Sequence, residues 1–152
     1  MSLTINHTGI KGNVPIDPTF NGASPIDTIA EQLATAYIQS LVAGAVVGQD
    51  ANGYVQLAEP GTVEALGFLV LNAAGGFYEN VPALGSLQVA VIQGNSEIIT
   101  DQTSVPIVAG DQLYADNATP GFLTNVLTSN GRIVGIAKTS AGAGLPVTVA
   151  TL

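Results

Sequence analysis

The residues that could carry out catalysis are few and scattered. The chain of 152 residues has one histidine, His7, and no cysteine. A Ser-His-Asp triad needs a histidine that a carboxylate orients beside a nucleophile, yet no carboxylate is near His7 in sequence and no G-x-S-x-G motif is present. One histidine without cysteine also excludes nearly all zinc sites. We therefore predict a non-enzymatic protein with no catalytic residue, no metal site and no cofactor.

Two pairs of carboxylates are close in sequence, Glu59 with Glu64 and Glu97 with Asp101. A glycosidase holds two carboxylates about 5–10 Å apart in a cleft that usually also carries aromatic side chains for the sugar. The chain has no tryptophan, and both pairs fall among turn-forming residues. Solvated loop carboxylates are the favoured interpretation, and a hydrolase that uses them is the weakest functional hypothesis.

Two further motifs match known ligand-binding loops only in part. The segment Asp50-Ala51-Asn52-Gly53 resembles a fragment of a calcium loop, with an echo at Asp116-Asn117. A full EF-hand loop needs more oxygen ligands and a terminal glutamate, so we predict β-turns here. The segment Gly142-Ala143-Gly144 precedes a predicted strand instead of a helix, and it is predicted to be a tight turn, not a phosphate loop.

The overall composition excludes two classes of partner. Only 9% of the residues are charged, against about 25% in ordinary domains, and the net charge is −8. Three basic side chains (Lys11, Arg132 and Lys138) are too few to neutralise nucleic-acid phosphates or bind an anionic membrane. The apolar runs are far shorter than the ~20 residues of a spanning helix, and the first residues do not have the pattern of a signal peptide. We expect neither nucleic acid nor a membrane as a partner. We also expect that partner subunits or neutral side chains cover much of the surface.

Three regions follow one another along the chain. Residues 1–24 mix glycine and proline with isolated apolar residues, which predicts an extended N-terminal arm that docks onto a neighbour. The candidate interface residues are Ile5, Ile10, Val14 and Phe20.

Residues 25–41 form a helix or a linker in this interpretation. Pro25 suits the first helical position, and Ile29, Leu33 and Tyr37 follow helical spacing, although a strand over Ala36–Val42 competes.

Residues 42–152 predict a β-rich domain, because short β-prone segments alternate with turn signals. The predicted strands are Ala45–Gln49, Tyr54–Ala58, Gly67–Asn72, Leu87–Ile92, Glu97–Thr100, Gln112–Ala115, Phe122–Val126, Gly131–Thr139 and Leu145–Thr151.

Part of this region echoes itself. Val42-Ala43-Gly44 recurs as Val108-Ala109-Gly110, and Gly67-Phe68 is matched by Gly135-Ile136. The ordered matches favour an internal duplication with halves 42–92 and 108–152, with chance recurrence of common residues as the alternative.

The C-terminal third resembles a known family. The segments that carry the resemblance are Val108-Ala109-Gly110-Asp111-Gln112-Leu113-Tyr114-Ala115-Asp116, Gly131-Arg132-Ile133-Val134-Gly135-Ile136-Ala137 and Ala141-Gly142-Ala143-Gly144-Leu145-Pro146-Val147-Thr148-Val149. They resemble the capsid decoration, or cement, proteins of tailed bacteriophages. The first half departs from the pattern, because Ala45 stands where the second half has Asp111.

The resemblance implies an all-β protein with small β-barrel or β-tulip-like domains, assembled as a homotrimer. It implies a location on the outer capsid surface of the virion, where the chain would bind major capsid protein, bridge its subunits and stabilise the shell. The alternative is another β-rich virion or surface component, such as a head fibre, a tail part or a glycan-binding module.

Overall fold

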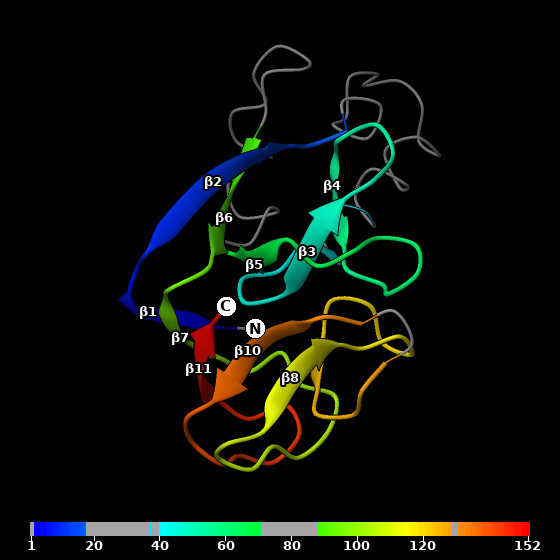
Figure 1. The fold of residues 1–152 in the computed structure, drawn as a ribbon. Helices are drawn as coiled ribbons and strands as arrows, with labels where there is room; N and C mark the ends of the chain where they lie inside the picture. The colour runs from blue at the N-terminus through cyan, green and yellow to red at the C-terminus, as the bar shows by residue number, and fades with distance from the viewer. Residues whose placement is uncertain (1, 18–36, 38–39, 71–87, 129–130) are drawn as a thin grey trace.

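The computed structural model describes residues 2–17, 37, 40–70, 88–128 and 131–152, with the side chains of Ile10 and Lys11 left aside. The described part consists of two antiparallel sheets, one above the other in Figure 1. The predicted all-β class is confirmed. Both sheets end in edge strands, and no pairing among the described residues closes either of them into a barrel.

The upper sheet in Figure 1 has five strands and the lower sheet has six. The five-stranded sheet has the order β2 (Ile10–Pro15), β6 (Gln88–Gln93), β5 (Gly67–Leu69), β3 (Val46–Gln49) and β4 (Val55–Leu57). The six-stranded sheet has the order β1 (Leu3–His7), β7 (Glu97–Thr100), β11 (Val147–Thr151), β10 (Ile133–Ala137), β8 (Gln112–Ala115) and β9 (Leu123–Thr124). Valine, isoleucine and threonine are frequent in these strands because branched side chains pack well on a pleated surface.

A two-stranded ribbon joins the sheets. β2 pairs with β6 in one sheet, and β1 pairs with β7 in the other, so the N-terminal segment follows the segment 88–100 across both. The ribbon turns from one sheet to the other at Gly9 and Gly94-Asn95, where Asn95 has a φ of 51° and the Gly9 amide donates to Ser96 Oγ. The N-terminal residues are thus extended, as edge strands of the two sheets.

The two sheets share one arrangement of strands. Leaving β1 aside, the order β2-β6-β5-β3-β4 corresponds to β7-β11-β10-β8-β9, in the same sequence along the chain. The registers correspond as well. The pair Val47 and Gly67 corresponds to the pair Leu113 and Gly135, and the pair Phe68 and Ile92 corresponds to Ile136 and Ala150. Likewise, the pair Gly48 and Gln56 corresponds to Tyr114 and Thr124, and the pair Val14 and Val89 corresponds to Thr100 and Val147. The sequence echo therefore falls on structurally equivalent positions.

Turns outside the strands repeat too. Ala45 donates its amide to the Val42 carbonyl at 3.1 Å, and Asp111 does the same to Val108 at 3.0 Å. The third residue of each turn, Gly44 or Gly110, has a positive φ of 85° or 95°. Glycine adopts this conformation without the penalty that a side chain brings.

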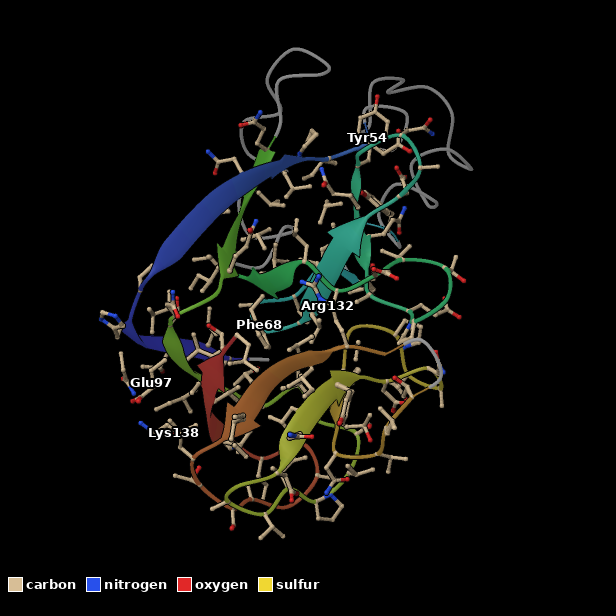
Figure 2. The ribbon with its side chains drawn as sticks, in the orientation of Figure 1. Tyr54, Phe68, Glu97, Arg132 and Lys138 are labelled. Carbon is tan, nitrogen blue, oxygen red and sulfur yellow. The ribbon has the colours of Figure 1, made fainter. Side chains whose placement is uncertain are left out.

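The buried residues form two clusters. The larger one lies between the sheets and combines Val46, Phe68 and Ile92 of the five-stranded sheet with the inner face of the six-stranded sheet, and Figure 2 shows Phe68 there. The positions equivalent to these three, Gln112, Ile136 and Ala150, lie on the opposite, outer face of the six-stranded sheet. Ile136 is 38% exposed. The five-stranded sheet therefore packs against the six-stranded sheet through this face, whereas the equivalent face of the six-stranded sheet points outward.

The smaller cluster covers the other face of the five-stranded sheet. Val47, Leu69 and Val91 pack there with Ile16 and Leu41.

Tyr37 packs against this cluster, and its hydroxyl donates a hydrogen bond to the Val55 carbonyl at 2.5 Å. Burial raises the pKa of Tyr37 to about 12. The helix or linker predicted over residues 25–41 lies outside the described residues, apart from 37, 40 and 41.

Candidate interaction surface

The histidine and its neighbouring carboxylate lie on the surface of the six-stranded sheet. His7 is exposed at the end of β1, and Glu97 is partly exposed at the start of β7. Glu97 accepts hydrogen bonds from Lys138 Nζ at 2.8 Å and Asn6 Nδ2 at 3.1 Å, and Figure 2 shows the pair with Lys138. The Lys138 hydrogen bond, with smaller help from Asn6, holds the pKa of Glu97 below its usual value. These contacts attach β1 and β10 to β7.

Asp101 fastens the N-terminal end of the same ribbon. It accepts from the Ser2 amide at 3.0 Å and from Gln102 Nε2 at 2.7 Å. Burial raises the pKa of the Asp101 carboxyl, but hydrogen bonds, these two among them, outweigh burial and lower the value to about 2.

The other predicted pair, Glu59 and Glu64, is exposed in the loop between β4 and β5. The described residues hold no group of three or more histidine or acidic side chains that could bind a metal ion.

The two aspartate turns bond to their own backbone. Asp50 Oδ1 accepts from the amides of Asn52 at 2.8 Å and Tyr54 at 3.0 Å, and Asp116 Oδ1 accepts from the Ala118 amide at 3.0 Å. This is the turn predicted for both segments, with the carboxylate oxygen directed to the backbone.

The predicted interface residues of the N-terminal segment separate into different environments. Ile5 is 38% exposed on β1, whereas Val14 is only 2% exposed and packs in the chain's own core beneath β2. The buried position of Val14 removes it from the surface, because alternate residues of an edge strand still face the core. Ile10 lies in β2 with its side chain not described, and Phe20 lies outside the described residues.

Two loop segments at the lower end of the six-stranded sheet in Figure 1 carry exposed apolar side chains. Segments 104–110, before β8, and 139–146, between β10 and β11, lie against each other there, and we call their exposed residues the loop surface. Val108 is 60% exposed and Leu145 is 57% exposed. Val126 and Leu127, 62% and 70% exposed, directly follow Asn125, which donates to the Pro106 carbonyl at 3.3 Å. These four are among the seven exposed large hydrophobic residues of the described part.

Hydrogen bonds hold the two segments together. Ile107 and Ala141 exchange backbone bonds of 2.8 and 2.9 Å. Ala109 donates its amide to Ser140 Oγ at 2.9 Å, and Gly144 donates to the Thr103 carbonyl at 3.1 Å. The loop surface is therefore a fixed part of the fold.

Asp111 closes the first of these segments. Its Oδ2 accepts from Asn125 Nδ2 at 2.8 Å and from the Val108 amide at 2.9 Å. The hydrogen bond from Asn125, and then that from Val108, lower the pKa of Asp111. Asp111 thus fixes the backbone that presents Val108.

The residues of the loop surface are uncharged, and Asp111 and Lys138 border the two segments. No acidic or basic residue occurs in 104–110 or 139–146, in a chain whose net charge is −8. Sequence reasoning did not single out this surface, although the two charge-free segments are visible in the sequence.

Comparisons with known proteins return neither a matching family model nor a curated relative. Within the described residues, no helix is long and apolar enough to cross a membrane.

Proposed function

We propose that the chain is a structural virion protein that binds the outside of an assembled phage capsid and stabilises it by bridging major capsid subunits. The loop surface is the observation that carries this proposal, because an uncharged apolar area on a rigid β body suits contact with another protein. Two of the three segments that resemble cement proteins, 108–116 and 141–149, contribute to this surface.

Binding of this kind needs no catalytic group. A protein that binds only the assembled shell lowers the free energy of that shell by mass action. Apolar contact contributes about 25 cal/mol per Å² before association costs, and loops already fixed by hydrogen bonds lose little entropy on binding. Self-association as a homotrimer, as the resemblance implies, belongs to the same proposal.

Cosedimentation with empty, expanded shells of the source phage tests the proposal. We expect the purified chain to pellet with shells at a fixed stoichiometry and to raise the temperature at which they fall apart. A chain that stays in the supernatant at micromolar concentration would contradict the proposal. A reproducible hit on a glycan array would instead favour the alternative of a glycan-binding surface component.

A further inference from the structure

The two V-A-G turns occupy equivalent positions but have opposite surroundings. The turn 42–45 of the five-stranded sheet lies against the six-stranded sheet, where the Gly44 carbonyl accepts from Thr100 Oγ1 at 3.0 Å. Ala43 is 8% exposed, and a Cβ on Gly44 would collide with Thr100 Oγ1. The first turn is therefore buried in a contact between the two sheets of the same chain.

The second turn, 108–111, is free of such cover. Val108 is 60% exposed, Ala109 and Gly110 are exposed, and a Cβ on Gly110 would meet nothing within 4 Å. Both turns keep the same hydrogen bond to the strand beside them, from Gly44 to Leu69 and from Gly110 to Ala137, at 2.8 Å each. The geometry that docks in one half is thus presented to solvent in the other.

We propose that the loop surface is the contact through which the chain docks on the shell, and that its occupant is an uncharged, partly apolar surface of the major capsid protein. This inference rests on the proposed function and assigns its contact residues, with Val108 and Leu145 at the centre. The first turn shows how this geometry is received, because Thr100 provides a hydroxyl donor beside apolar neighbours. Because the loop-surface residues are uncharged, a neutral, partly apolar partner can cover them without removing any of their side chains' charges from water.

A second copy of the chain does not fit this role. Its Thr100 is fully buried and already bonded to its own Gly44. The equivalent position in the five-stranded sheet is Val14, which is 2% exposed and covered by Ile16 and Leu41. Among the described residues, both receiving positions are occupied within each copy, so a second copy could not repeat this contact, and we assign the surface to a different protein.

The test compares three aspartate variants of the full chain in the shell cosedimentation assay. Val108→Asp and Leu145→Asp place a charge in the loop surface, and we expect each to weaken shell binding about tenfold or more, because an unpaired carboxylate is costly in an apolar contact. Leu152→Asp is the matched control, since Leu152 is also 60% exposed but lies at the end of β11, beside Phe68 and Arg132. It should bind like the unchanged chain.

The outcomes separate the inference from the function beneath it. If the unchanged chain does not bind shells, the proposed function and this inference both fail. If all four proteins bind equally, the function stands and the loop surface is not the contact. Sedimentation velocity is run on each variant in parallel, and a change of oligomeric mass in Val108→Asp would assign the surface to self-association and overturn the choice of partner. Circular dichroism melting confirms that each variant is folded.

Discussion

At the scale of single residues, a comparison of Gly44 with Gly110 distinguishes the cost of backbone strain from the cost of a packing collision. Both have a positive φ, which costs a residue with a side chain about 1–2 kcal/mol, but only Gly44 lies against a neighbour. We expect Gly110→Ala to lower the free energy of unfolding by about that amount. Gly44→Ala should lose a further ~1–3 kcal/mol, because its methyl group collides with Thr100. Urea denaturation of both variants measures the difference, and equal losses would contradict the buried position of the first turn.

The lowered carboxyl pKa values give a prediction for acid. A carboxylate whose pKa is lower in the folded state adds stability above its unfolded pKa near 4, and this is lost as the pH falls through the folded value. For Asp101, with a pKa of about 2, the loss falls between about pH 4 and pH 2, and Glu97 and Asp111 act in the same direction.

The melting temperature should therefore decrease once the pH drops below about 4. In Asp101→Asn the fall should be shallower, because the titrating group is gone. Glu64→Gln is the control, since exposed Glu64 has no side-chain hydrogen bond among those of the described residues. An unchanged pH profile in Asp101→Asn would refute the assignment.

At the scale of elements, the ribbon of β1–β2 with β6–β7 depends on the bend at Gly9. A Cβ there would lie 2.6 Å from the Asn95 carbonyl oxygen and 2.8 Å from that of Gly94. We expect Gly9→Ala to cost about 1–3 kcal/mol and to increase hydrogen exchange along β1, because main chain must move. Gly12→Ala is the matched control in β2, where the nearest atom is the flexible end of Gln93 at 3.1 Å. Equal exchange in both variants would argue against a fixed bend.

The nine strands predicted from residue 42 onward each overlap a strand of the structure, because local alternation and turn residues suffice to locate them. β1 and β2 were predicted only as an extended arm. Their partners, β7 and β6, are far along the chain, so no local pattern shows the pairing. The exposure of Val108 was not predictable either, since the same turn is covered in one half and open in the other.

At the scale of the whole molecule, the core between the sheets makes them one folding unit. Phe68 is 1% exposed in this core, whereas its structural equivalent Ile136 is 38% exposed on the outer face. We expect Phe68→Ala to cost about 3–5 kcal/mol and Ile136→Ala less than about 1 kcal/mol. Unfolding should remain a single transition, measured by urea with two spectroscopic probes, and a variant in which one sheet melts first would show independent units.

The matched registers of the two sheets also bear on refolding. Strands with equivalent pairing can replace one another, and repeated architectures misassemble by exchanging equivalent elements between neighbouring chains. Here the exchange is penalised, because swapping β5 with β10 would bring Phe68 to a solvent-facing position and Ile136 to a buried one. The divergence of side chains at this equivalent position thus favours one arrangement of β5 and β10, and we expect it to limit misassembly at high concentration.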